Sequence, residues 1–329
     1  MTAPRSDRPG VTYAASLSDV RAAEARIAPF VRRTPLHTSR QLDARAGLEV
    51  FLKCETFQRT GSFKARGATN AVQKLDEASA RRGVVTHSSG NHAQALAWAA
   101  SVRGIAAHVV MPTNAPAAKR AAVLGYGARV IECAPTLESR ESTAAAVVAE
   151  TGGTLIPPYD HPDVIAGQGT IALELCEDVP DLDAVIVPVG GGGMISGITL
   201  ALRELSPRTR VIGAEPLGAD DAARSKLAGE RLLQTDPRTV ADGLRTSLGT
   251  LTWPVVRDCV SSIVTPTEEE IVLAMRFVFE RVKLVIEPSA AVGVAVVLGA
   301  ALRTDASLRK VAVVLCGGNV DLDHLPWQR

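Results

Sequence analysis

One lysine surrounded by small residues is the side chain of this sequence best suited to covalent chemistry. Lys64 directly follows Phe63 within the stretch TGSFKARGA at residues 60–68. An amine that loses its proton in a confined site can form a Schiff base with an aldehyde. Lysines are far more often solvated than catalytic, so this stretch alone leaves both interpretations open.

A run of four glycines has the sequence context of a phosphate site. The run follows an apolar stretch at residues 184–189 and precedes a helical pattern; it comprises Gly190, Gly191, Gly192 and Gly193, with Met194 next. Glycine backbone N–H groups can approach an anion closely, and a helix dipole favours negative charge. A tight turn without a ligand is the alternative. Neither a P-loop nor a G-x-G-x-x-G pattern is present, which disfavours a P-loop ATPase and a Rossmann dinucleotide enzyme.

Two further polar segments follow predicted strands. Ser88, Ser89, Asn91 and His92 lie between a strand and a helix, where exposed N–H groups and side-chain donors would hold a carboxylate. Simple N-capping by Ser or Asn is the alternative. Cys316 ends an apolar run and precedes two glycines, which is also typical of a core cysteine before a turn.

Composition bounds the class of protein. The 329 residues are 46% hydrophobic and 22% charged, which is too apolar for a disordered chain and suits one large or two medium domains. The net charge of +1 provides no field that would gather nucleic acid or an acidic membrane. The longest apolar run, residues 289–302, is shorter than the roughly 20 residues of a bilayer span and predicts a buried helix.

The cysteines and the first residues indicate a cytoplasmic protein. Five widely spaced cysteines without a C-x-x-C pair encode neither a disulfide framework nor a zinc knuckle. Residues 1–17 lack the apolar core of a secretory signal, so we expect a loose tail there.

Short strands and helices alternate along the chain. Strands are predicted at residues 83–86, 106–111, 128–133, 184–189, 210–214 and 311–316, and helices at 92–102, 117–124, 142–151 and 268–283. Strict alternation predicts parallel βαβ units and an α/β fold with two wound sheets. We expect a large domain formed by residues 1–78 and 155–329 and a small domain at residues 79–154.

Five motifs in this order resemble the fold type II pyridoxal-phosphate (PLP) enzymes, specifically the serine racemase and serine/threonine dehydratase family. They are SFKARGA at 62–68, SSGNH at 88–92, AGQGT at 166–170, the tetraglycine, and CGGN at 316–319. The resemblance extends from about residue 16 to residue 325. It implies a two-domain, tryptophan synthase β-like fold with parallel twisted sheets and helices on both faces.

The resemblance implies a role for each motif in binding PLP. Lys64 would hold PLP as a Schiff base and move the substrate α-proton on one face, and Phe63 would pack against the pyridine ring. Residues 190–194 would bind the phosphate, and Asn91 would bind the ring hydroxyl. Cys316 would lie against the pyridine nitrogen. A neutral partner weakens the ring as an electron sink, which favours prompt loss of a β-hydroxyl.

The same resemblance implies the substrate contacts. The side chains expected to hold the substrate carboxylate are Ser88, Ser89, Asn91 and His92. Ser89 matches the second acid/base of the racemases, on the face opposite Lys64.

The resemblance also implies a divalent cation and leaves a nucleotide open. The carboxylates of Glu215 and Asp221 and the carbonyl of Ala219 match the family's cation ligands, and oxygen ligands suit Mg²⁺ or Ca²⁺. A solvated acidic turn is the alternative. Tyr126 and Lys283 match two ATP contacts at a subunit interface of the racemases, although an ordinary core-edge tyrosine and surface lysine explain them equally well. A homodimer is expected.

Several activities follow from these matches. We expect β-elimination of L-threonine or L-serine to a 2-keto acid and ammonia through Lys64. The alternatives are a serine racemase that uses Lys64 and Ser89, a threo-3-hydroxyaspartate dehydratase, and a catalytically silent PLP-binding homologue. Residues 241–247 resemble the racemases, whereas residues 157–162 resemble catabolic threonine dehydratases. The partners expected are therefore small hydroxy amino acids, with no nucleic acid and no membrane.

Overall fold

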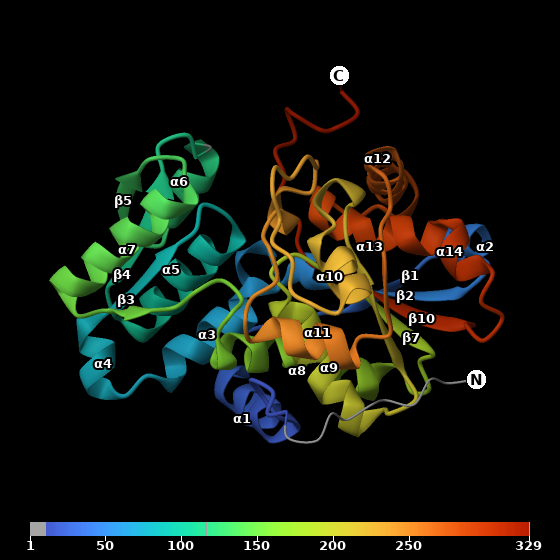
Figure 1. Ribbon diagram of the computed structural model, residues 1–329, viewed down its shortest axis with the longest axis horizontal. Helices are drawn as coiled ribbons and strands as arrows, with labels where there is room; N and C mark the ends of the chain where they lie inside the picture. Colours follow the sequence, from blue (N-terminus) through green and yellow to red (C-terminus); the bar gives the residue numbers. More distant parts are fainter. Residues whose placement is uncertain (1–10, 116, 329) are drawn as a thin grey trace.

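The computed structural model describes residues 11–115 and 117–328, and it has two lobes, each built around its own sheet (Figure 1). The first ten residues, where a loose tail is expected, lie outside the described residues. Within the described part of the chain, no helix combines the length and apolarity needed to cross a bilayer.

The larger lobe contains a six-stranded sheet. Its strands, in spatial order, are β1 (Leu36–Thr38), β2 (Glu49–Cys54), β10 (Lys310–Leu315), β7 (Ala184–Pro188), β8 (Arg210–Ala214) and β9 (Ser262–Val264). Only β1 pairs antiparallel; the other neighbours are parallel. The central strands β7 and β10 are apolar and buried almost throughout, as expected of parallel strands covered on both faces.

The smaller lobe contains a four-stranded parallel sheet. Its order is β5 (Arg129–Cys133), β4 (Ala107–Pro112), β3 (Val84–His87) and β6 (Thr154–Leu155). The helices of this lobe are α4 (Glu77–Arg82), α5 (Asn91–Arg103), α6 (Ala117–Gly125) and α7 (Leu137–Thr151). The expected α/β class with parallel sheets is confirmed. The domain boundaries at residues 79 and 154 stay predictions.

The helices outside the small lobe lie on both faces of the larger sheet or between the two lobes (Figure 1). They are α1 (Leu17–Ile27), α2 (Arg40–Ala46), α3 (Lys64–Lys74), α8 (Pro162–Asp178), α9 (Gly193–Leu205), α10 (Asp221–Ala228), α11 (Thr252–Cys259), α12 (Glu268–Phe277), α13 (Pro288–Leu298) and α14 (Ala300–Arg303). Short 3₁₀ turns cover Glu55–Phe57, Arg59–Gly61, Leu217–Ala219 and Asp242–Leu244.

Two expected helices end earlier than their sequence patterns indicate. The pattern at 268–283 is α-helical only to Phe277, because Val278–Val282 form a π-helical turn that stops at Lys283 with φ +66°. The apolar run at 289–302 is divided at Gly299, whose extended backbone ends α13. Glycine is a poor helix former, so a break there costs little.

Glycines let three helices beneath the sheet approach each other closely. A Cβ on Gly67 of α3 would lie 2.7 Å from the Val164 carbonyl oxygen of α8. A Cβ on Gly197 of α9 would lie 2.2 Å from the Ile165 carbonyl oxygen. Because no larger residue fits, the 166–170 motif gains a structural role: it forms the surface of α8 against which α3 and α9 pack.

Candidate active site

Lys64 is the first residue of α3 and is fixed beside the end of β10. Ser62 forms a β-bridge with Gly317, and the Phe63 N–H donates to the Cys316 carbonyl at 3.0 Å. The Lys64 ammonium donates to the Pro158 carbonyl at 2.7 Å and lies 4.9 Å from the centre of the Phe63 ring. Burial lowers the pKa of Lys64 to about 8. A substantial neutral fraction therefore exists near neutral pH, as a nucleophilic amine requires.

The tetraglycine lies between the end of β7 and the start of α9. A Cβ on Gly191 would lie 2.3 Å from the Tyr159 ring, and one on Gly190 would lie 3.0 Å from the Leu244 Cα. Gly192 is the N-cap of α9 with φ +85°, and no side chain caps this helix. The first-turn N–H groups thus have neither an intrahelical acceptor nor a cap, which suits a phosphate. Met194, in that first turn, is buried in the core.

The serine-rich segment lies between β3 and α5, as the sequence predicts. Ser88 and Ser89 are partly exposed, and the N-cap residue Gly90 supplies no side chain to the helix. His92 is buried, and its Nε2 lies 3.0 Å from the Ile156 carbonyl. Burial lowers the pKa of His92 to about 3, so the imidazole is neutral. Only the backbone N–H of His92 therefore remains suited to the carboxylate contact expected of this residue.

A hydrogen-bonded chain connects three of the motifs. The Asn91 side-chain amide donates to both carboxylate oxygens of Glu287, at 2.9 and 3.0 Å. The Asn319 amide donates to Asn91 Oδ1 at 2.9 Å and to the Thr60 carbonyl at 2.8 Å. These contacts join the start of α5, the loop after β10 and the segment before Lys64 into one wall.

Glu287 belongs to none of the motifs and is a site residue that the sequence does not single out. It is 5% exposed, and burial raises the pKa of its carboxyl to about 7. A weak signal was available, because Glu287 lies two residues before the longest apolar run, whose helix is buried.

Cys316 directly follows β10, beside Glu287. Its Sγ lies 3.9 Å from a Glu287 carboxylate oxygen, and the side chain is 2% exposed. Burial raises the thiol pKa well above its ordinary value. The thiol is therefore neutral, as a partner of an unprotonated pyridine nitrogen must be.

Lys64 and the tetraglycine meet the same loop, residues 157–160. Lys64 contacts the Pro158 carbonyl, while the Tyr159 ring covers Gly191. Asp160 anchors this loop by accepting from the Thr250 and Leu251 N–H groups at 2.9 and 2.8 Å. The amine of Lys64 and the tetraglycine, a candidate phosphate site, therefore contact the same loop. This arrangement fits a cofactor that has both an aldehyde and a phosphate.

Unpaired polar atoms near Lys64 also fit a polar ligand. The side-chain oxygens of Thr60 and Ser62 are buried and have no hydrogen-bond partner among the described residues. The Nδ1 atom of His92 also has no hydrogen-bond partner among the described residues. This imidazole is close enough to Lys64 that, besides burial, the Lys64 charge lowers its pKa. Buried polar groups without partners are uncommon in native proteins and often indicate an absent ligand or water.

The residues expected to bind a cation lie together after β8. Glu215 accepts from the Ala222 and Ala223 N–H groups, both at 2.8 Å, and Asp221 accepts from the Leu248 N–H at 3.0 Å. Burial raises the pKa of Glu215 to about 8 and that of Asp221 to about 6, and the Asp221 charge adds to the rise at Glu215. One Asp221 oxygen is buried and has no hydrogen-bond partner in residues 11–115 and 117–328.

Two buried carboxylates are too few ligands for a cation by themselves. Within residues 11–115 and 117–328, no group of three or more His, Cys, Asp or Glu side chains could hold a metal ion. A cation between Glu215 and Asp221 would therefore need backbone oxygens, such as that of the buried Ala219, together with water.

The two residues matched to a nucleotide site lie on different lobes. Tyr126 follows α6 and packs against the core of the small lobe. Lys283 is exposed at the end of the π turn in the large lobe. The nucleotide site stays a prediction.

Comparison with known proteins agrees with this geometry. The family model described as "Pyridoxal-phosphate dependent enzyme" matches residues 27–317. A serine racemase of Arabidopsis thaliana is 50% identical over 95% of this chain and 96% of its own length. A beta-hydroxyaspartate dehydratase of Paracoccus denitrificans (strain Pd 1222) is 52% identical over 96% of this chain and 99% of its own length.

Solved structures agree as well. The structure of maize serine racemase covers 94% of this chain and 95% of its own, with 47% identity and a TM-score of 0.93. Family, sequence relatives and fold thus lead to one conclusion: the chain belongs to the pyridoxal-phosphate-dependent enzymes of fold type II, within the serine racemase and serine/threonine dehydratase family.

Proposed function

We propose that this enzyme eliminates the β-hydroxyl of L-threonine or L-serine as water, and that a water molecule then hydrolyses the released enamine to a 2-keto acid and ammonia. The observation that carries the proposal is the placement of Lys64 beside Cys316. The N–H of Phe63, which precedes Lys64, donates to the Cys316 carbonyl at 3.0 Å. The two side chains are an amine with a pKa of about 8 and a neutral thiol. Bound PLP supplies an electron sink for the bond that loses its proton. A neutral partner at the ring nitrogen limits that sink, which favours loss of the β-hydroxyl over a long-lived carbanion.

The chain's own residues would bind and orient the reactants. N–H groups of residues 190–194 would hold the phosphate, and Asn91, fixed by Glu287, would face the ring. N–H groups and hydroxyls at the start of α5 would hold the substrate carboxylate. Lys64 would then take the α-proton on its own face.

Racemisation is the second candidate, and Ser89 favours it. Its hydroxyl is partly exposed on the segment between β3 and α5, where it could return a proton on the face opposite Lys64. Relatives named as serine racemases support this candidate, and the Paracoccus relative supports a 3-hydroxyaspartate substrate. A silent PLP-binding homologue would be the conclusion only if no hydroxy amino acid were converted.

We also propose a divalent cation at Glu215, Ala219 and Asp221, and a homodimer. Two buried carboxylates with raised pKa values support the cation, because a positive charge there would offset the cost of ionising both. Exposed apolar side chains on the large lobe, among them Phe57 and Val285, support a second subunit.

Lys64→Ala should abolish both turnover and the visible absorbance of the bond between the protein and PLP. In wild-type protein freed of PLP, the rate of bond formation should rise with pH and level off above about 8, because only the neutral amine of Lys64 attacks. Stopped-flow absorbance measures this rate. Lys74→Ala, which alters an exposed ion pair of the same helix, is the control and should behave as wild type. A fully active Lys64→Ala variant would refute the assignment.

Ser89→Ala should stop D-amino acid formation while keto acid continues to form. L-serine, L-threonine and L-threo-3-hydroxyaspartate are supplied separately, and keto acid and D-amino acid are measured in the same samples. Loss of a general acid/base costs about 10²- to 10⁴-fold in rate. Undiminished racemisation in Ser89→Ala would exclude Ser89 as the second acid/base, and a wild type that only racemises would exclude elimination as the main activity.

Mg²⁺ or Ca²⁺ should stabilise the protein, and Glu215→Gln should remove that effect. At a free cation concentration 100-fold above Kd, linkage predicts about 2.7 kcal/mol of added stability. Thermal unfolding with excess chelator or excess cation measures the difference. Glu269→Gln, an exposed glutamate of α12, is the control and should respond to the cation as wild type does. Identical midpoints with and without cation would eliminate the proposed site.

A further inference from the structure

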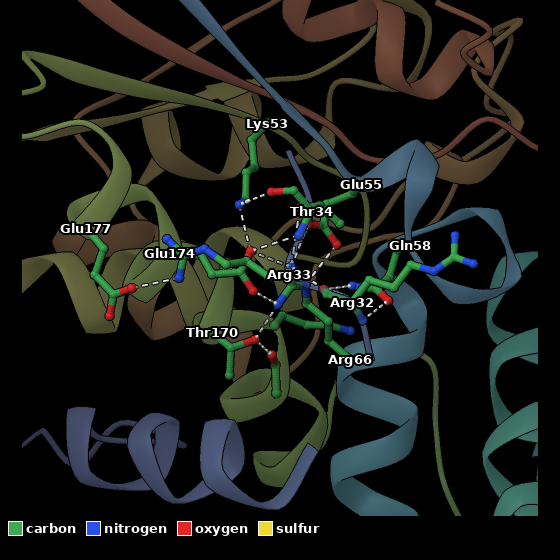
Figure 2. Close-up of polar contacts among 12 residues, drawn as sticks. Arg32, Arg33, Thr34, Lys53, Glu55, Gln58, Arg66, Thr170, Glu174 and Glu177 are labelled. Atoms are coloured by element: carbon green, nitrogen blue, oxygen red, sulfur yellow. Dashed lines mark hydrogen bonds and ion pairs between the residues drawn. The ribbon is translucent and has the colours of Figure 1, made fainter. Parts of the chain in front are cut away.

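Four charged side chains lie almost completely buried behind the start of α3 (Figure 2). They are Lys53 at 0%, Glu55 at 0%, Arg66 at 1% and Glu174 at 7% exposure, and their formal charges sum to zero. They come from β2, the 3₁₀ turn after it, α3 and α8. We call these four residues the Arg66 cluster.

Arg66 lies at the centre of the cluster and is held from two sides. Its Nε and one terminal nitrogen each donate to a different Glu55 oxygen at 2.8 Å. Its two terminal nitrogens donate to the two Glu174 oxygens at 2.6 and 3.0 Å, and one also donates to Thr170 Oγ1 at 3.1 Å. A planar guanidinium bound in this way has little freedom to rotate or translate.

Glu174 is in turn fixed by other donors. Lys53 contacts it at 2.6 Å and donates to the Thr34 carbonyl at 2.8 Å, while the Thr34 N–H donates to Glu174 at 3.2 Å. The Thr34 hydroxyl donates to Glu55 at 2.5 Å. The cluster therefore connects α3 rigidly to both α8 and the large sheet.

Lys64 and Arg66 lie on opposite sides of the same helix. Two residues correspond to a rotation of about 200° in an α-helix, so Lys64 faces the loop at 157–160 when Arg66 faces the core. No side chain caps the N-terminus of α3, where Phe63 is the N-cap residue. Ser62 and Phe63 hold the chain just before the helix through Gly317 and Cys316. The rotation and depth of the first turn of α3 then depend also on contacts further along the helix.

We propose that the Arg66 cluster is the positioning device for Lys64, which holds the first turn of α3 so that the amine reaches a bound cofactor. The proposal rests on the catalytic role given to Lys64 above. Arg66, Glu55, Glu174 and Lys53 touch neither Lys64 nor the tetraglycine loop, and they act only through the helix. The 166–170 motif contributes to this positioning through Thr170, which accepts a hydrogen bond from Arg66, in addition to its close glycine contacts.

Stability alone is a weaker explanation of the cluster. Burying four charges carries a desolvation cost that well-packed apolar residues would not incur, and replacing buried ion pairs by such residues is often neutral or stabilising. The guanidinium geometry does specify a single orientation of α3. An amine displaced by about 1 Å can lose about 100-fold in rate, which makes orientation the larger effect.

The test compares Arg66→Lys and Glu174→Gln with Ile171→Ala. Ile171 is a fully buried residue of α8 whose truncation destabilises the core without touching the cluster. The readouts are hydrogen exchange of the α3 backbone in protein freed of PLP, the rate and pH profile of PLP bond formation, and kcat and KM for keto acid. Thr170→Val serves if the charged variants do not fold, because at similar volume it removes only the two hydrogen bonds of the Thr170 hydroxyl, one from Arg66 and one to the Gly167 carbonyl.

We expect faster exchange at the start of α3 and a fall in kcat of about 100-fold with KM little changed for Arg66→Lys. The pH at which bond formation levels off should rise above about 8, because Lys64 is no longer held in its buried position. Ile171→Ala should lose stability and keep all three properties. Thr170→Val should show the same changes as Arg66→Lys to a smaller extent.

Two results would overturn the inference. The first is that Arg66→Lys and Glu174→Gln fold and have the wild-type pH profile and kcat. If only Thr170→Val folds, a wild-type pH profile and kcat in that variant would overturn the inference. The other is an equal fall in kcat for Ile171→Ala at equal loss of stability. Failure of the proposed function is distinct: wild-type protein would then form no keto acid from hydroxy amino acids, while hydrogen exchange of α3 and the rate of PLP bond formation would still compare the variants.

Discussion

The position of one amine, at the start of α3, is the constraint on which the rest of the site depends. Lys64 must lie where the loop after β7, the segment after β3 and the end of β10 converge, and the backbone contacts of Ser62 and Phe63 with Gly317 and Cys316 hold it there. The rest of the helix is held from behind by glycine contacts with α8 and by the buried charges around Arg66. The fold therefore holds in a fixed position the Lys64 amine, which must form the covalent bond.

Burial of the side chains around that amine favours their neutral forms. Burial lowers the pKa of Lys64 and His92 and raises those of Glu287 and Cys316, so each group has a larger neutral fraction than in water. A site built in this way can bind an anionic cofactor through backbone N–H groups without a concentration of positive side chains. The small net charge of the chain fits this arrangement, because both expected anions, a phosphate and a carboxylate, would be bound by N–H groups at helix N-termini.

Local sequence patterns predicted the α/β class and the elements on which the motifs lie, because each motif combines a strand end, a turn and a helix start. They did not predict Glu287 or the Arg66 cluster. These depend on contacts between residues far apart in the chain, such as Arg66 with Glu174 and Asn91 with Glu287. The early end of α12 at Phe277 was missed as well, because the apolar periodicity continues unbroken through the π turn.

Chemical mapping of the protein–cofactor bond tests the central claim, that Lys64 is the amine on which the whole site converges. The PLP-loaded protein is reduced with borohydride, digested, and analysed by mass spectrometry for the lysine that carries the reduced cofactor. The account predicts a single modified peptide that contains Lys64, at a yield close to one per chain. Modification of another lysine, or no modification in protein that still converts hydroxy amino acids, would contradict it.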